Sequence, residues 1–191
     1  MGNVIFDISM SLDGLITAAN PRPQAGLGNG GERLHDWAFN SADPRNRQIM
    51  EWYATMGANI FGRTTYDLAI RNWGADGPSG AARIRTVIVS HSVPRDVPEG
   101  GVYHFVDSVE SALETAKELA GDKDIYITGA DVAQQFLKRG LIDEISIHLV
   151  PVLFGSGTRL FENLDGEHIA LEVIEVIQTA EAVHMRFRVV K

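Results

Sequence analysis

Residues 125–137 read IYITGADVAQQFL, and this stretch decides the fold. It begins with β-branched and aromatic residues, as a buried strand does, and its later apolar residues repeat with the spacing of one helical face. Gly129 lies at the turn between the two elements. The free N–H groups at the start of a helix favour an anion, and a glycine lets the backbone approach it closely. The stretch therefore indicates either a phosphate-binding turn or an ordinary connection capped by Asp131.

Outward from this stretch, strand and helix patterns alternate along the chain. Predicted strands cover residues 4–10, 58–61, 86–90, 102–106, 125–127, 145–153, 169–177 and 183–190. A predicted helix covers residues 44–56, and another follows the turn 128–131 and is closed by Gly140. One more begins near residue 64, and a last one begins at the capping-box spacing of Asp107 and Glu110 and ends near Ala120. This order predicts an α/β fold with a mainly parallel central sheet, helices on both faces and a C-terminal antiparallel hairpin at one edge.

Two features of these strands carry further expectations. Asp7 lies inside an almost continuous apolar strand and needs a partner, because an unpaired buried carboxylate is costly. Pro151 lies inside the predicted strand 145–153 and indicates an edge position or a bulge. The irregular segment 18–31 is rich in glycine and proline, and it is either a functional lid or disordered.

Length and composition limit the class of protein. The chain has 191 residues, of which 45% are hydrophobic and 22% charged, so we expect a single globular domain over residues 1–191. The net charge of −8 and the absence of Lys or Arg clusters argue against nucleic acid as a partner. There is no cysteine, and the six histidines have no ligand spacing, so we expect no metal.

Nothing in the sequence indicates a membrane or a secretory signal. No apolar run approaches the ~20 residues of a membrane helix. The N-terminal residues lack the basic region of a signal peptide. We expect a cytoplasmic protein without a membrane partner.

Three predicted strands end in turns of small and polar residues: 62–65 (GRTT), 90–92 (SHS) and 128–131 (TGAD). In a parallel sheet these ends point the same way, which favours a dinucleotide site. Thr64, Thr65 and Ser90 can donate to phosphate oxygens. Arg63 can bind a 2′-phosphate with two N–H groups, which favours NADP over NAD, or it forms a surface ion pair.

The segments VIFDISMSLDGLI (4–16), GRTTYD (62–67), TVIVSHSVP (86–94) and the block from Ile125 to Phe161 resemble the dihydrofolate reductase superfamily. More narrowly, they resemble the reductase domain of the bifunctional riboflavin-biosynthesis deaminase/reductase. The likeness covers nearly the whole chain. It implies a dihydrofolate reductase-like fold and NADPH as cofactor.

The resemblance also implies roles for individual residues around NADPH. The loop of Asp13 and Gly14 would flank the nicotinamide as a lid. The remaining cofactor residues are, from the adenosine side through the pyrophosphate to the nicotinamide side, Gly62, Arg63, Thr64, Thr65, Ser90, His91, Gly129, Ala130, Asp131, Val132, Leu153, Phe154, Gly155 and Gly157. Two positions differ from the family pattern: Thr128 stands where a glycine is common, and the first helix offers only Glu51 as the acid that binds a pterin.

Hydride transfer needs a placed nicotinamide and, for many substrates, a proton donor. The candidate acids are Asp36, beside the long loop, and Asp13, on the lid. The expected activity is NADPH-dependent reduction of a small heterocyclic or ribosyl-pyrimidine substrate, as in a 5-amino-6-(5-phosphoribosylamino)uracil reductase. The alternatives are a dihydrofolate reductase and a non-catalytic dimeric nucleotide-binding protein. The apolar strand that contains Ile145 and Ile147 predicts a homodimer formed along that edge.

Overall fold

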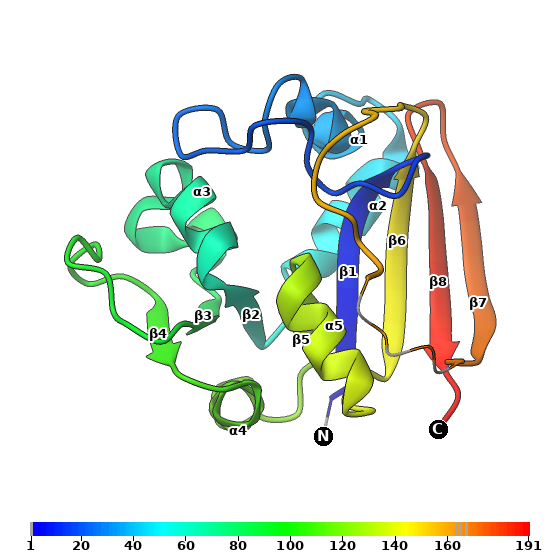
Figure 1. Cartoon of the computed structure of the whole chain (residues 1–191). Coiled ribbons are helices and arrows are strands. Elements are labelled where there is room, and N and C mark those ends of the chain that lie inside the picture. Colours follow the sequence, from blue (N-terminus) through cyan, green and yellow to red (C-terminus); the bar gives the residue numbers. More distant parts are fainter. Residues whose placement is uncertain (1, 163, 165, 167) are drawn as a thin grey trace.

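One sheet of eight strands organises the molecule, in the order β4-β3-β2-β5-β1-β6-β8-β7 (Figure 1). The computed structural model describes residues 2–162, 164, 166 and 168–191. The strands are β1 (Val4–Ser11), β2 (Ala58–Gly62), β3 (Arg85–Val89), β4 (Tyr103–Val106), β5 (Ile125–Thr128), β6 (Glu144–Val150), β7 (Leu171–Gln178) and β8 (Val183–Val189). Strands β1 to β6 pair in parallel, whereas β8 pairs antiparallel with β6 and β7. The predicted parallel sheet with a C-terminal hairpin at one edge is therefore confirmed.

Helices cover both faces of the sheet, as the strand and helix alternation predicts. They are α1 (Asp36–Phe39), α2 (Pro44–Tyr53), α3 (Arg63–Trp73), α4 (Val109–Ala120) and α5 (Ala130–Lys138), with short 3-10 turns η1 (Gly31–His35), η2 (Gly74–Asp76) and η3 (Gly80–Ala82). Ile125 and Ile127 point to the face that α4 and α5 cover. Tyr126, between them, points to the opposite face and packs against Phe61 of β2 and Tyr53 of α2. No helix in the described part of the chain is long and apolar enough to cross a membrane.

Local sequence signals explain most helix ends. Asp43 is the N-cap of α2 and accepts a hydrogen bond from the backbone of Arg45, with Pro44 at the first helical position. The capping-box prediction for α4 is wrong by one residue: Ser108, and not Asp107, accepts from the backbone of Ser111. A serine hydroxyl competes well for this position, because its oxygen is close to the main chain.

The predictions for the strand 145–153 are wrong in position. Strand β6 ends at Val150, so Pro151 follows the strand and interrupts no ladder. β6 is an interior strand between β1 and β8. Ile145 and Ile147 are buried in the chain's own core, so they offer no edge to a second copy. At this end of the sheet the edge strand is β7.

Candidate functional site

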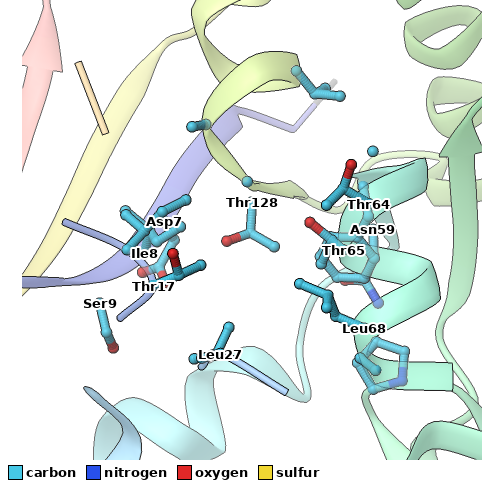
Figure 2. Close-up of a pocket in the computed structure, with 18 of the residues that line it drawn as sticks. Asp7, Ile8, Ser9, Thr17, Leu27, Asn59, Thr64, Thr65, Leu68 and Thr128 are labelled. Carbon is cyan, nitrogen blue, oxygen red and sulfur yellow. The ribbon is translucent and has the colours of Figure 1, made fainter. Parts of the chain in front are cut away.

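A large cleft opens at the carboxyl ends of the parallel strands and continues over the face of the sheet that α2 and α3 flank. Its volume is about 1190 Å³. Small-molecule sites usually occupy ~300–1,000 Å³, so this cleft has room for a dinucleotide together with a small substrate. Figure 2 shows Asp7, Ser9 and Thr17 on one side of the cleft and Thr64 and Thr65 on the other.

The turns after β2 and β5 lie against each other in this cleft. Gly129 has a φ of 96°, and a Cβ there would lie 3.0 Å from Oγ1 of Thr65. A Cβ on Gly62 would lie 3.1 Å from Val132. Glycine is therefore required at residue 129 for both its backbone conformation and the close approach of the two turns.

The start of α5 faces the same space. Gly129 is the N-cap and provides no side-chain acceptor, which corrects the alternative that Asp131 caps the helix. Ala130, Asp131 and Val132 all line the cleft, as does Thr128 (Figure 2). Backbone N–H groups at a helix start favour an anion, so this turn could hold a phosphate.

Arg63 connects the turn after β2 to the turn after β3. Its Nη1 donates to the carbonyl oxygen of Ser92 at 3.2 Å and to Oγ of Ser90 at 3.4 Å. Its Nε donates to Asp67 at 2.7 Å, an ion pair within α3. Arg63 thus forms the partly exposed ion pair, and it also lines the cleft beside Ser90 and His91. Binding of a 2′-phosphate by Arg63 stays a prediction.

The hydroxyls of Thr64 and Thr65 have no hydrogen-bond partner among the described residues, although both residues line the cleft (Figure 2). Thr64 is exposed and Thr65 is half-buried. Free donors beside an arginine and a helix start suit the oxygens of a phosphate. The chemistry of these three turns therefore fits a phosphorylated cofactor.

A second group of predicted residues lies together but outside the cleft. Asp13 accepts from Ser11 Oγ at 2.6 Å and from the backbone of Gly155 at 2.7 Å and Phe154 at 3.2 Å. These hydrogen bonds, that of Ser11 first, lower the pKa of Asp13 to about 2. Asp13 therefore fastens its loop, with Gly14, to the segment that contains Leu153 and Gly157, and it is ionised at neutral pH.

The segment that contains Leu153 and Gly157 does not line the cleft itself, but the residues that it contacts do. A Cβ on Gly157 would lie 1.9 Å from the carbonyl oxygen of Thr17, so only glycine permits this approach. Beside it, Thr158 donates its backbone N–H to Thr17 Oγ1 at 2.9 Å, and both threonines line the cleft. Asp36, the other candidate acid, accepts from Asn40 at 2.7 Å and does not line the cleft. Neither Asp13 nor Asp36 is among the residues that line the cleft, and their role as proton donors stays a prediction.

A buried polar cluster in the wall of the cleft was missed as a functional site. Asp7, Tyr53 and His148 all line the cleft and lie within 2.7 to 3.1 Å of one another. Asp7 and His148 are buried, and Tyr53 is half-buried. Burial, followed by the charge of Asp7, raises the pKa of the Tyr53 hydroxyl well above its usual value. The one available signal was a carboxylate inside an apolar strand, which required a buried partner.

A family model for the RibD C-terminal domain matches residues 3–185. The chain belongs to this family. Among the proteins it resembles is YwjB of Bacillus subtilis strain 168, an uncharacterized protein that is 24% identical over 164 residues, covering 85% of this chain and 84% of YwjB.

Solved structures share the fold over the whole chain. A Shewanella sp. PV-4 protein, provisionally named a riboflavin biosynthesis protein, superposes with a TM-score of 0.69 at 24% identity, covering 99% of each chain. A Thermotoga maritima diaminohydroxyphosphoribosylaminopyrimidine deaminase/5-amino-6-(5-phosphoribosylamino)uracil reductase superposes with a TM-score of 0.67 at 15% identity, over 99% of this chain and 57% of that chain. The present chain thus spans little more than half of the bifunctional protein. At these identities the likeness shows the dihydrofolate reductase-like fold alone.

Proposed function

We propose that this protein is an NADPH-dependent reductase that transfers hydride to a small heterocyclic or ribosyl-pyrimidine substrate. The observation that carries the proposal is the convergence of three polar turns, 62–65, 90–92 and 128–131, on one cleft at the strand ends. Members of the RibD C-terminal domain family are typically NADPH-dependent reductases, which supports the same assignment.

In the proposed complex the three turns have separate tasks. The backbone N–H groups at Ala130 and Asp131 would bind the pyrophosphate, and the free hydroxyls of Thr64 and Thr65 would donate to phosphate oxygens. Arg63 would bind the 2′-phosphate, because a guanidinium offers paired N–H donors that match phosphate oxygens. The cofactor, once bound, supplies the hydride.

The substrate would occupy the part of the cleft nearest Asp7 and Tyr53. The name of the Thermotoga maritima relative suggests 5-amino-6-(5-phosphoribosylamino)uracil as the first compound to test. We also propose that the protein acts as a homodimer in the cytoplasm.

A fluorescence titration with NADPH and NADH tests the cofactor. We expect NADPH to bind well below millimolar concentration, and the Arg63→Ala variant to lose NADPH affinity about tenfold, or ~1.4 kcal/mol, with a smaller loss for NADH. Arg71→Ala is the matched control, since Arg71 lies in the same helix outside the cleft lining. Equal losses for both cofactors would show that Arg63 does not bind the 2′-phosphate. If neither cofactor bound, the proposed function would fail.

Cofactor oxidation tests the reaction. NADPH is incubated with the protein and 5-amino-6-(5-phosphoribosylamino)uracil, and then with pterin and quinone substrates in turn. We expect oxidation with the ribosyl-pyrimidine. Binding of NADPH without oxidation by any of these compounds would favour the non-catalytic alternative.

A further inference from the structure

A chain of buried hydrogen bonds extends from the cleft into the protein. The Tyr53 hydroxyl donates to Oδ1 of Asp7 at 2.7 Å and lies 2.8 Å from Nε2 of His148. The same Nε2 lies 3.1 Å from Oδ2 of Asp7. On the far side of the ring, Nδ1 of His148 lies 2.7 Å from Nδ1 of His184. Finally, Nε2 of His184 lies 2.8 Å from Oδ1 of Asn46.

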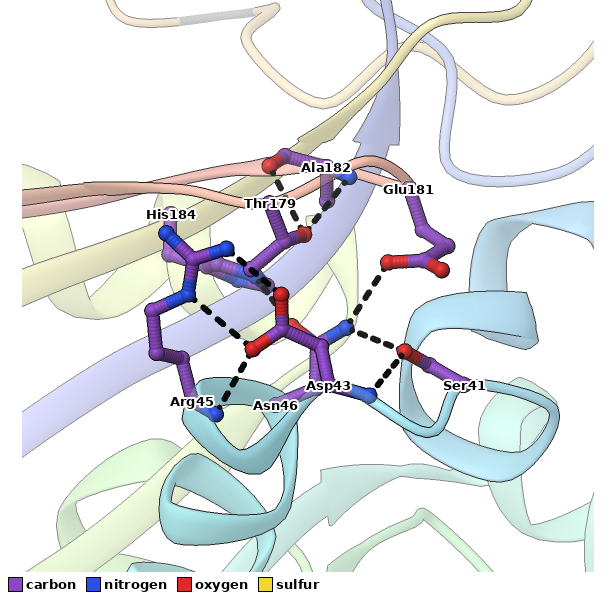
Figure 3. A network of polar contacts seen from close by, with 8 residues as sticks. All are labelled: Ser41, Asp43, Arg45, Asn46, Thr179, Glu181, Ala182 and His184. Carbon is purple, nitrogen blue, oxygen red and sulfur yellow. Dashed lines mark hydrogen bonds and ion pairs between the residues drawn. The ribbon is translucent and has the colours of Figure 1, made fainter.

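At the inner end of this series of hydrogen bonds, the direction of donation is fixed. The Asn46 amide nitrogen donates to Ser41 Oγ at 2.9 Å and to Oε2 of Glu181 at 3.1 Å (Figure 3). A carboxylate can only accept, so the amide nitrogen must face Glu181 and the amide oxygen must face His184. His184 therefore carries a proton on Nε2 and donates it to Asn46.

This direction is passed to the next histidine. Burial, followed by the charge of His148, lowers the pKa of His184 to about 4, so His184 is neutral near pH 7 and carries only its Nε2 proton. Its Nδ1 is then an acceptor, and Nδ1 of His148 must donate to it. A neutral His148 would consequently present an unprotonated Nε2 to the side chain of Asp7.

At the outer end, Asp7, Tyr53 and His148 then have one proton too few to satisfy all their hydrogen bonds. With Asp7 ionised and His148 neutral, the Nε2 lone pair would face a carboxylate oxygen at 3.1 Å. The single proton of Tyr53 can satisfy either His148 or Asp7, but not both. One additional proton, on His148 or on Asp7, satisfies every contact. An unpaired polar atom at this depth destabilises the fold, so the hydrogen-bond geometry favours the arrangement with the additional proton.

The surroundings keep this proton away from bulk water. Trp37 is 3% exposed, and its ring lies on that of His148 with 4.3 Å between centroids. Its Nε1 donates to Ser9 Oγ at 2.9 Å, which holds the ring in place. The other ionisable groups around the chain are Tyr126 of β5, His35 of η1, and Asp43 and Arg45 beside His184. Burial raises the pKa of the Tyr126 hydroxyl, so it too keeps its proton.

We propose that Asp7 and His148 store one proton in the wall of the cleft, and that Tyr53 passes this proton to the substrate. The passing step depends on the reductase function proposed above. The bound cofactor would supply hydride to an electrophilic carbon of the substrate, and the heteroatom bonded to that carbon would then gain an electron pair. The Tyr53 O–H bond breaks and a heteroatom–H bond forms. The stored proton, on Nε2 of His148 or on the Asp7 carboxyl group, then reprotonates Tyr53, and one proton from water replaces it.

The stored proton is measured on the protein alone, without cofactor or substrate. ¹⁵N-histidine NMR at pH 7.5 reports protonation of each imidazole nitrogen, and difference infrared spectroscopy against Asp7→Asn reports a neutral carboxyl group. We expect either a doubly protonated His148 or a protonated Asp7, with His184 neutral and protonated at Nε2. An unprotonated Nε2 on His148 beside an ionised Asp7 would overturn the proposal.

Passing of the proton is measured with Tyr53→Phe, which keeps the ring and removes the hydroxyl. A general acid typically contributes ~10²–10⁴-fold, so we expect kcat for 5-amino-6-(5-phosphoribosylamino)uracil to fall about 100-fold. The Kd for NADPH should stay within about twofold, and the solvent isotope effect on kcat should change. Tyr103→Phe is the matched control, because this hydroxyl donates to Gly74 outside the cleft and its loss should leave kcat unchanged.

The two measurements separate the two proposals. If Tyr53→Phe retains kcat within threefold, Tyr53 is not the donor. If the wild-type protein binds NADPH but reduces no compound, the passing step is rejected together with the reductase function. The spectroscopic result still decides whether the proton is stored.

Discussion

The two walls of the cleft use polar side chains in opposite ways. On the side of α3 and α5, the hydroxyls of Thr64 and Thr65 are without a partner among the described residues and face the open space. On the side of β1 and β6, Asp7 and His148 are buried and bonded to each other and to Tyr53. The first wall is left ready for a ligand, whereas the second is satisfied within the protein. A free donor binds what arrives, and a satisfied buried network fixes protons and geometry.

This difference predicts that truncation on the two walls affects different properties. Removing a partner from the network leaves buried polar atoms unpaired, which lowers stability. Removing a free hydroxyl from the other wall breaks no hydrogen bond of the folded protein, so the free energy of unfolding should hardly change. The following changes test that contrast.

The largest effect is expected for Asp7→Ala. This variant should lose about 3 kcal/mol of unfolding free energy, since Tyr53 and His148 both lose a buried partner. Thr64→Ala on the opposite wall should change it by less than about 0.5 kcal/mol and should weaken NADPH instead. Urea denaturation of both variants gives the comparison. Equal losses of unfolding free energy in the two variants would show that side chains on the two walls contribute equally to stability.

The next effect concerns pH and His184. Its folded-state pKa of about 4 lies below the ~6.5 of an unfolded histidine, so the unfolded chain binds a proton first as the pH falls. The resulting loss of unfolding free energy is absent above pH 6.5, grows as the pH falls from 6.5 to 4 and is complete below pH 4. We expect wild type to lose about 2–3 kcal/mol more than His184→Gln across the window.

The control for this measurement is His168→Gln, because the side chain of His168 is exposed. Its unfolding free energy should follow the wild-type pH dependence. A His184→Gln variant with the wild-type slope would show that His184 is not held neutral by the fold.

The contrast between the walls also explains what the sequence could predict. The turns 62–65 and 128–131 are contiguous, and each contains its own strand end, glycine and helix start, so they could be recognised locally. The parallel strand order then placed them together. The network, in contrast, joins residues separated by 46, 95 and 141 positions, and no local pattern connects them.

Contacts between residues far apart in sequence were also beyond local patterns. The sequence shows Asp13 and Asp36 as acids beside predicted loops, but it does not show that Asp13 accepts from the backbone of Phe154 and Gly155. Pro151 indicates an edge or a bulge only if the strand continues to residue 153, whereas β6 ends at Val150. Strand interiors were predicted well from apolar runs. Strand ends, and the partners of buried polar groups, depend on contacts that are distant in sequence.

A smaller effect is expected at Gly129. Gly129→Ala adds a Cβ at a positive φ and 3.0 Å from Thr65 Oγ1, so it should cost about 1–2 kcal/mol of stability and weaken NADPH about tenfold. Gly140→Ala is the control, with a φ of 64° and no atom within 4 Å of the added Cβ. It should show a similar stability loss and bind NADPH normally. Fluorescence titration of both variants with NADPH separates the effect of backbone strain on stability from the effect of the altered turn on phosphate binding.

The smallest effect on the fold is expected at β7, the exposed edge beside the strand that carries His184. Leu171, Val173 and Val176 are 44%, 67% and 57% exposed, and an apolar edge strand is suited to pairing with a second copy. We expect a homodimer by light scattering at micromolar concentration, and a monomer for Val176→Lys, with a stability change under about 0.5 kcal/mol.

Val93→Lys, which changes another exposed valine away from β7, should remain dimeric. A monomeric wild type would reject the dimer. Val176 pairs with Met185 in β8, next to His184. If the monomeric variant kept the wild-type ¹⁵N-histidine spectrum, the buried network would be a property of the single chain. If the His184 signal changed, the second copy would contribute to that wall of the cleft. The difference between the two walls would then depend on dimer formation.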